Sequence, residues 1–181
     1  MTHHDKPFFS WKGKSFDFKS EEVTLPNGKR TRIEVVRHPG CSAIVPVRKD
    51  QSVILLRQYR PVIRNYIWEV PAGTMHEGED PLVCAKRELE EECGLTGHRF
   101  EKIGEVLTAP GYSDERIHLF LAMDLTPSEQ NLDEDECLEI HFFSFEEAME
   151  MIHRGEIEDG MTIVALQMAH LRLRENPKQS I

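Results

Sequence analysis

Residues Gly73–Leu95 read GTMHEGEDPLVCAKRELEEECGL, and this stretch decides the fold of the chain around it. Asp80 is a good N-cap residue, Pro81 suits the first helical position, and Gly94 suits a left-handed C-cap. Between these signals, apolar residues recur at spacings of three and four and give one apolar stripe. The stretch therefore predicts a helix over residues 81–93 that packs one face against a core.

Acidic residues crowd the second half of this predicted helix, at Glu88, Glu90, Glu91 and Glu92. At about 100° per residue, three of them (88, 91 and 92) fall within an arc of about 100°. Carboxylate oxygens are the ligands that Mg²⁺ or Mn²⁺ prefers, often beside the phosphates of a substrate. The patch therefore indicates a divalent-metal site for a phosphate compound; the alternative is a solvated acidic face with basic partners one turn away.

The spacing of the whole stretch is more specific than an acidic helix face. Gly73 is followed by five residues, Glu79, seven more residues, and then RELEEECGL at 87–95. This pattern matches the Nudix box at every fixed position, so the chain resembles a Nudix hydrolase. The resemblance implies a mixed sheet between helices. It also implies a loop-helix-loop that holds divalent metals against a nucleoside-linked diphosphate, which water cleaves.

Composition limits the other classes of function. A chain of 181 residues suits one domain with a small appendage, and its formal net charge of −10 argues against a nucleic acid polymer as partner. There is no long apolar run or apolar N-terminal signal, and the four cysteines lack the spacing of a zinc site or a disulfide framework. We expect a cytoplasmic protein with reduced thiols and no membrane partner.

Turn signals divide the rest of the chain. Pro26-Asn27-Gly28 separates strand-like runs over 15–25 and 30–38, which predicts an N-terminal β-hairpin. Further strands are expected over 41–47, 52–58, 99–107, 116–123 and 138–143, and helices over 144–154 and 161–175. This order predicts an α/β (α+β) fold, a Nudix-type α/β/α sandwich around a mixed sheet. Residues 1–38 would form the hairpin appendage and residues 39–181 the hydrolase domain.

Four further segments resemble the ADP-ribose pyrophosphatase branch of the Nudix hydrolases. They are RQYR at 57–60, WEVPAG at 68–73, PGYSDER at 110–116, and the acidic run before LEI at 138–140. In that branch the N-terminal hairpin is exchanged across a homodimer and helps to close each active site, so the resemblance implies a homodimer.

The same resemblance implies the reaction. The substrate would be ADP-ribose, cleaved to AMP and ribose 5-phosphate, or a related nucleoside diphosphate sugar. GDP-mannose and ADP-glucose are the main rivals as preferred substrate. A ligand sensor that kept the fold without hydrolysis is the alternative of another class, and the intact set of box glutamates disfavours it.

The metal site and the catalytic base would come from two parts of the chain. We expect Mg²⁺, with Mn²⁺ as an alternative, to be bound by Glu88, Glu91, Glu92 and the backbone carbonyl of Ala72. Bound metals neutralise a diphosphate and lower the pKa of a bound water. In this branch the base lies on a mobile loop, which here corresponds to residues 133–136, with Glu136 or Glu134 as the base. An ordinary solvated loop is the alternative interpretation of this acidic run.

Three other side chains are candidates for substrate binding. Arg60 ends a predicted strand, and its planar guanidinium suits a diphosphate better than lysine would. Arg37, near the end of the hairpin, is a second candidate, and an ordinary surface arginine is the alternative for both. Glu115 can accept hydrogen bonds from ribose hydroxyls or pair across a strand.

Supporting roles are expected for three residues of the box. Arg87 can orient Glu88 or Glu91, and Glu79 can brace the loop before the helix. Gly73 is expected to adopt a backbone conformation that side chains forbid.

Overall fold

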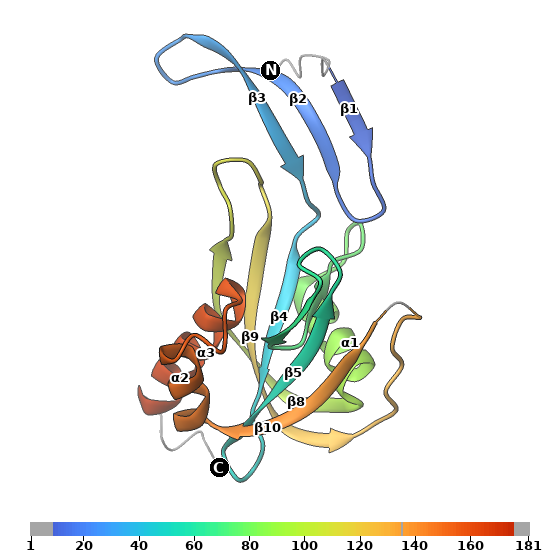
Figure 1. The fold of residues 1–181 in the computed structure, drawn as a ribbon, viewed down its shortest axis with the longest axis vertical. Helices are drawn as coiled ribbons and strands as arrows, with labels where there is room; N and C mark the ends of the chain where they lie inside the picture. The colour runs from blue at the N-terminus through green and yellow to red at the C-terminus, as the bar shows by residue number, and fades with distance from the viewer. Residues whose placement is uncertain (1–8, 135, 176–181) are drawn as a thin grey trace.

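The computed structural model describes residues 9–134 and 136–175, which form three β-sheets and three helices (Figure 1). Residues 1–8 of the predicted N-terminal appendage and Asp135 of the predicted base loop lie outside the described residues. The N-terminal sheet has the order β1-β2-β3, with β1 at Phe9–Lys12, β2 at Asp17–Thr24 and β3 at Arg30–Arg37.

The predicted N-terminal hairpin is confirmed as β2 and β3. The two strands pair antiparallel out to Thr24 and Arg30, and the Leu25 N–H donates to the Lys29 carbonyl across the turn at 2.8 Å. The additional strand β1 pairs antiparallel with β2, and was not predicted because four residues are too few to establish an alternating pattern. Its aromatic side chains contact those of β2 and of the turn, as in the Phe9–Phe18 pair.

Two further sheets build the body of the molecule. One has the order β10-β5-β6, and the other has the order β7-β4-β9-β8. Their bounds are β4 (Cys41–Pro46), β5 (Ser52–Arg60), β6 (Asn65–Glu69), β7 (Ala72–Thr74), β8 (Leu95–Leu107), β9 (Arg116–Pro127) and β10 (Leu138–Ser144). Because β4 and β9 are parallel while the other pairs are antiparallel, the second of these sheets is mixed.

The central strands are apolar on both faces, and this divides the core in two. In β4, Ala43 and Val45 belong to one buried cluster, whereas Ile44 between them belongs to the other. In β5, Leu55 and Leu56 likewise point into opposite clusters. Side chains alternate along a strand, so strands of this kind must be covered by helices on both sides.

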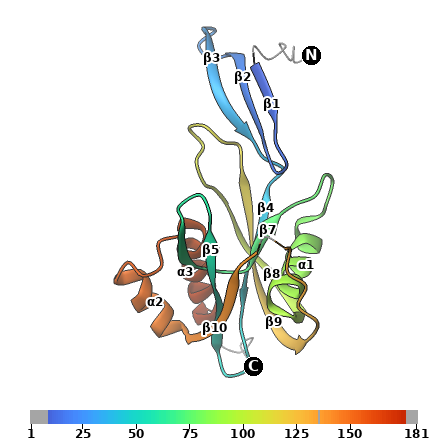
Figure 2. The same cartoon turned by 45° about the vertical axis from the view of Figure 1, so that its right-hand side comes forward.

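The helices provide this cover. On one side lies α1 (Pro81–Cys93), and on the other lie α2 (Phe145–His153) and α3 (Gly160–Glu175), as the two views show (Figures 1 and 2). Leu89 of α1 packs in one cluster, and Leu166 of α3 packs in the other. The predicted α/β/α sandwich around a mixed sheet is confirmed. The short strands β6 and β7 were not predicted, since both lie in a segment rich in turn-forming residues.

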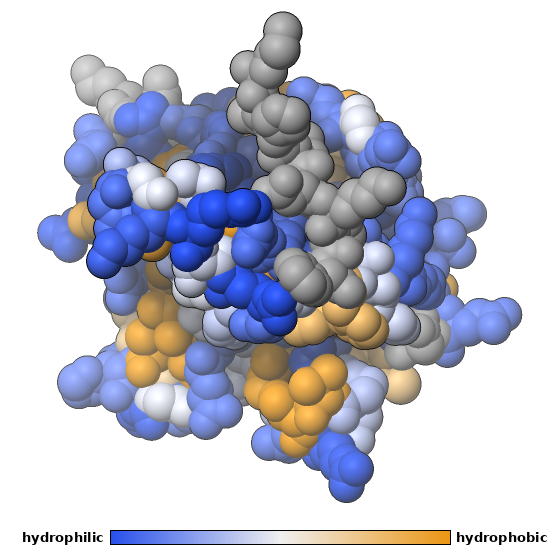
Figure 3. Space-filling view, turned by 90° about the horizontal axis from the view of Figure 1, so that it is seen from above, coloured by the Kyte–Doolittle hydropathy of each residue, from blue (hydrophilic) through white to orange (hydrophobic). Residues whose placement is uncertain are grey.

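The N-terminal sheet extends from one end of this body (Figure 1). It is held there by backbone contacts, because the Val36 N–H donates to the Tyr112 carbonyl at 2.8 Å and Val36 forms a parallel bridge with Ser113. Seen from this end, the surface is mainly hydrophilic with separate apolar patches (Figure 3). Within the described ranges, no helix combines the length and apolar character needed to span a membrane.

Candidate active site

The helix α1 has the ends that its sequence predicts. The Asp80 side chain accepts hydrogen bonds from the backbone N–H groups of Leu82 and Val83, at 2.9 and 3.3 Å. Gly94 is left-handed, with φ 62°, and its N–H donates to the Glu90 carbonyl. These local caps fix where the helix begins and ends, and the packing of its apolar stripe in the core fixes the face on which the glutamates lie.

The predicted acidic patch contains two buried carboxylates and one partly exposed one. Glu88 is 7% exposed and Glu92 is 2% exposed, whereas Glu91 lies nearer the surface. Burial raises the pKa of Glu88 to about 7, against the opposing effect of Arg87. Burial, and next the charge of Glu88, raise the pKa of Glu92 well above its ordinary value. The charged forms of these two carboxylates are therefore costly in this site unless a cation lies beside them.

Arg87 offsets part of this charge. Its Nη1 donates to Glu88 at 2.6 Å and to Glu91 at 2.9 Å, while its Nε donates to Glu79 at 3.1 Å. Glu79 also accepts from the backbone N–H of His76 at 2.8 Å. The structure thus contains both contacts expected of these residues: Arg87 orients the glutamates, and Glu79 braces the loop before the helix.

Gly73 is required for a different reason from the one expected. Its φ is not in the left-handed region, so the expectation of a forbidden backbone conformation is wrong. A Cβ at this position would overlap the carboxylate of Glu88. The glycine therefore provides space for a buried side chain, because β7 passes directly against α1.

The donor atoms here suit a hard divalent cation. Glu88 and Glu92 are buried carboxylates. The backbone N–H of Ala72 donates a hydrogen bond to the Glu92 carboxylate at 2.9 Å. Among the described ranges, no three His, Cys, Asp or Glu side chains already surround a single point, and the guanidinium of Arg87 lies against Glu88 and Glu91. The oxygen donors of these carboxylates, together with the charge that Arg87 does not offset, fit Mg²⁺ or Mn²⁺.

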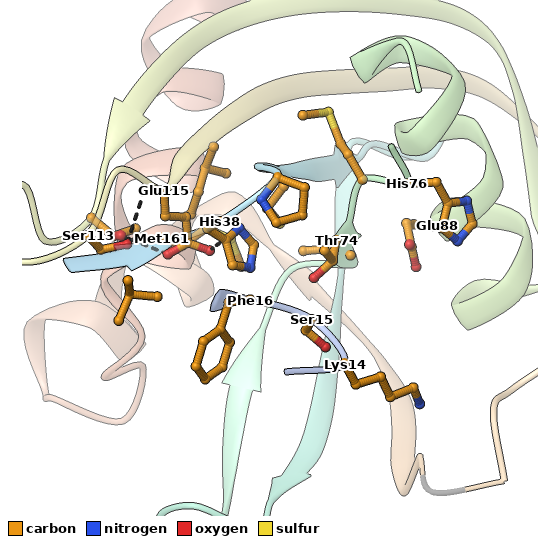
Figure 4. Close-up of a pocket in the computed structure, with 18 of the residues that line it drawn as sticks. Lys14, Ser15, Phe16, His38, Thr74, His76, Glu88, Ser113, Glu115 and Met161 are labelled. Atoms are coloured by element: carbon orange, nitrogen blue, oxygen red, sulfur yellow. Dashed lines mark hydrogen bonds and ion pairs between the residues drawn. The ribbon is translucent and has the colours of Figure 1, made fainter. Parts of the chain in front are cut away.

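These carboxylates open onto a cavity of about 1960 Å³. It is bounded by α1, by the ends of β5, β6 and β7, by the β8–β9 loop, by the start of α3, and by the turn between β1 and β2. In Figure 4, side chains of that turn, Lys14, Ser15 and Phe16, line the cavity together with Thr74 and Glu88. The N-terminal sheet therefore contributes to the wall of its own chain's cavity.

Arg60 and Arg37 both line this cavity, but each guanidinium already has acidic partners. Arg60 donates through Nε to Glu69. Arg37 donates to Asp114 at 3.0 Å and pairs with Glu21 of β2. Asp114 also accepts from the His38 N–H, so the Arg37 cluster ties the N-terminal sheet to the β8–β9 loop.

Glu115 is the last residue of the β8–β9 loop and also lines the cavity. It accepts a hydrogen bond from the Thr108 hydroxyl at 2.8 Å, and its other oxygen lies 3.6 Å from Nδ1 of His38 (Figure 4). The side chain remains partly exposed.

The two candidate bases occupy different places. Glu136 lines the cavity, and its charge contributes to the raised pKa of both Glu88 and Glu92. Its carboxylate accepts from the Asp133 N–H at 3.0 Å. Glu134 is exposed and is not part of the cavity wall.

Sequence reasoning missed two features of the wall. Glu69 is buried and holds Arg60, although it lies within the quoted segment WEVPAG. Asp159 caps α3 by accepting from the Thr162 N–H at 2.8 Å, and both Asp159 and the start of α3 line the cavity. The signal in the sequence was a lone glutamate between the apolar residues Trp68 and Val70.

Comparison with known proteins agrees with this geometry. A sequence profile of the NUDIX domain matches residues 36–163. The chain is 40% identical over 165 residues to the ADP-ribose pyrophosphatase of Bacillus subtilis (strain 168), covering 90% of this chain and 88% of that protein. It is 35% identical over 159 residues to the GDP-mannose pyrophosphatase of Cronobacter sakazakii (strain ATCC BAA-894), covering 78% and 81%.

A solved structure has the same fold. The crystal structure of an ADP compounds hydrolase superimposes with a TM-score of 0.78 at 23% sequence identity, covering 97% of this chain and 98% of that one. The likeness therefore extends over the N-terminal sheet as well as the body.

Proposed function

Because this chain belongs to the NUDIX domain family, we propose that it is a metal-dependent pyrophosphatase that hydrolyses the diphosphate of ADP-ribose and related nucleoside diphosphate sugars. The products from ADP-ribose are AMP and ribose 5-phosphate. GDP-mannose or ADP-glucose is the alternative preferred substrate.

One observation carries the proposal: the buried carboxylates of α1, the guanidinium of Arg60 and the carboxylate of Glu136 line the same cavity. A diphosphate needs cations around its oxygens and a base for the attacking water. A volume of about 1960 Å³ leaves room for both halves of a dinucleotide-sized substrate.

The residues proposed to hold the metal are Glu88, Glu91, Glu92 and the carbonyl of Ala72. Mg²⁺ is the proposed ion, and Mn²⁺ has the same ligand preference. When bound, the metal supplies charge neutralisation for the diphosphate and a lowered pKa for water. The protein's own contribution is to bury two of these carboxylates and to orient Glu88 and Glu91 through Arg87.

Glu136 is the proposed base, with Glu134 as the alternative. Its support is that Glu136 lines the cavity close enough to raise the pKa of Glu88 and Glu92. A base must come within hydrogen-bond reach of the water that it deprotonates. The place of Glu136 on the cavity wall supports this role, whereas Glu134 is exposed and does not line the cavity.

Arg60 is proposed to bind the diphosphate, and Glu115 the ribose hydroxyls. Glu115 has one oxygen engaged by Thr108 and retains acceptor capacity toward the cavity. Arg37 stays a candidate for substrate contact. Its ties to Glu21 and Asp114 support a second role, which is to set the height of the N-terminal sheet above the cavity.

We also propose that the chain acts as a homodimer through its N-terminal sheet. Phe9 and Trp11 share one face of β1 and are 55% and 53% exposed, which forms an apolar patch of the kind that marks a protein–protein interface. Light scattering tests this directly, because a dimer has twice the chain mass of 21.0 kDa. The predicted cytoplasmic location stays a prediction.

The central experiment measures products. Purified protein is incubated with Mg²⁺ and, separately, with ADP-ribose, GDP-mannose or ADP-glucose, and nucleoside monophosphate is separated by ion-exchange chromatography. We expect release of AMP from ADP-ribose. Binding without turnover of any of these compounds would instead identify a ligand sensor, and faster turnover of a hexose compound would reassign the substrate.

Matched pairs of variants distinguish the roles of the individual carboxylates. Glu90→Gln is the control for Glu92→Gln, because Glu90 lies on the same helix but is exposed and away from the cavity wall. Glu136→Gln and Glu134→Gln form a second pair in the base loop. We expect large losses in kcat for Glu92→Gln and Glu136→Gln only.

A further inference from the structure

Glu69 is a buried carboxylate of the cavity that the proposed mechanism leaves without a role. It ends β6, is 4% exposed, and lines the cavity. A buried carboxylate is costly unless a cation and hydrogen-bond donors satisfy it. Arg60 supplies these, so the two side chains form one unit.

The contacts use a single edge of the Arg60 guanidinium. Its Nε lies 3.0 Å from Oε1 and 2.9 Å from Oε2 of Glu69, and its Nη2 lies 2.8 Å from Oε2. Nη1 has no hydrogen-bond partner among residues 9–134 and 136–175. An arginine gripped along its Nε edge keeps its remaining N–H donors for a second anion.

The strand register explains why these side chains meet. Glu69 pairs with Leu56 across β5 and β6, so it faces the same side of the sheet as Leu56, Gln58 and Arg60. Arg60 lies four residues farther along β5, a separation of about 13 Å between backbone positions. Its side chain must therefore extend back along the strand, toward the acidic end of the cavity, to reach Glu69.

The site of Glu69 is itself held firmly. The next residue, Val70, donates its N–H to the buried hydroxyl of Thr162 at 3.0 Å. The N–H of Thr162 in turn donates to Asp159 at the start of α3. This chain of hydrogen bonds fixes the end of β6 to α3, so Glu69 is a rigid support for a long, flexible arginine.

We propose that Glu69 is a positioning residue that presents the Nη1 edge of Arg60 to the diphosphate of the substrate. This inference rests on the proposed function, since it assigns Glu69 to the binding of that same diphosphate. Glu69 itself does not touch the substrate; it acts through Arg60.

Steady-state kinetics of Glu69→Gln, Arg60→Ala and the double variant test the proposal. Glutamine keeps the shape but not the charge, so we expect KM for ADP-ribose to rise about tenfold while kcat stays within about threefold. The double variant should be no worse than Arg60→Ala alone, because Glu69 has no other role in binding. Additive losses would overturn the inference.

The chain contains a matched control pair. Arg57 and Glu139 lie on the paired strands β5 and β10, with their charged atoms 3.5 Å apart on the exposed surface, and neither lines the cavity. Arg57→Ala and Glu139→Gln should leave KM unchanged. A similar rise in KM from either would show that removing any charge pair on this sheet has the same effect.

Chemical rescue separates positioning from a purely structural role. Guanidinium ion added to Arg60→Ala should lower KM, because Glu69 can hold the ion in the vacated place. The same addition to the double variant should have no effect. Equal rescue of both variants, or of neither, would contradict the proposal.

A second variant guards against loss of folding in Glu69→Gln. Arg60→Lys keeps the charge but cannot bond Glu69 along one edge and the diphosphate along another, so its KM should rise nearly as much as that of Arg60→Ala. A wild-type KM in Arg60→Lys would overturn the inference. If the unmodified protein turns over no nucleotide sugar, the proposed function fails; if it does but Glu69→Gln keeps its KM, only the positioning role fails.

Discussion

Replacing Gly73 by alanine tests whether the space beside β7 is reserved for the carboxylate of Glu88. An alanine Cβ would overlap that carboxylate, and the Glu88 side chain would have to move. The end of a glutamate is normally flexible, which would make the change inexpensive. Here, however, the side chain is 7% exposed and bonded to Arg87 at 2.6 Å, so it cannot move without breaking that contact.

The expected loss follows from these contacts. A hydrogen bond between charged groups contributes about 1.5–3 kcal/mol. Alanine reduces the entropy of the unfolded chain and returns about 0.4–1 kcal/mol, because Gly73 does not have a positive φ. The free energy of unfolding should therefore fall by about 0.5–2.6 kcal/mol.

Urea unfolding, followed by circular dichroism, measures this change. In a chain of this size, each kcal/mol corresponds to about 2–4 °C in Tm, so thermal unfolding gives an independent reading. Turnover should also fall, on the order of tenfold or more, because Glu88 is displaced from its proposed metal-binding position.

Gly111→Ala is the control, since a Cβ there meets no atom within 4 Å and its φ is also not positive. The reasoning is refuted if Gly73→Ala is as stable and as active as Gly111→Ala. If Gly73→Ala lost activity but not stability, the expected loss in free energy of unfolding would be wrong, while the displacement of Glu88 by the alanine Cβ would still hold.

Four further changes have defined outcomes. Glu92→Gln should lower kcat by about 100-fold or more, yet leave the Tm of metal-free protein unchanged or higher, because burial disfavours the charged carboxylate; chelation of the metal should likewise abolish turnover of the unmodified protein until Mg²⁺ is restored. Thr162→Val removes the acceptor for the Val70 N–H and should cost about 1–3 kcal/mol in urea unfolding. Hydrogen bonds from the side chain of Lys102, and next from that of Arg116 on β9, lower the pKa of Glu105 to about 2. Its stabilisation is therefore complete above the unfolded pKa of about 4.3 and is lost as pH falls toward 2. Glu105→Gln should consequently be less stable than the unmodified protein at pH 7 and equal to it near pH 2, as measured by Tm across pH; a constant difference would contradict this.

The amount that could be predicted differed between helix and strand. The bounds of α1 were predicted at 81–93 because Asp80, Pro81 and Gly94 act within one turn of the helix ends. The start of β8 was placed four residues late, because Leu95–Gly97 pairs with the distant end of β9 and has no strong strand signal of its own. Strand β6 was missed for a different reason: it is only five residues long and lies in a segment rich in turn-forming residues, so its pairing with β5 had to be seen in the structure.

The candidate site divides in the same way. The sequence by itself determined that Glu88, Glu91 and Glu92 share one face of a helix, because helical rotation is a local property. Tertiary structure alone decided that Glu88 and Glu92 are buried while Glu91 is not, because burial depends on how β7 and the segment before β10 pack against α1.

Tertiary structure also decided the partners of the charged side chains. Arg60 meets Glu69 through the register of β5 and β6, and Arg37 meets Asp114 across 77 residues of chain. Helix caps and spacing operate over three or four residues, so they can be read from the sequence. Strand register and long-range ion pairs arise only when distant segments are brought together, and these set which acidic partner each arginine of the cavity has.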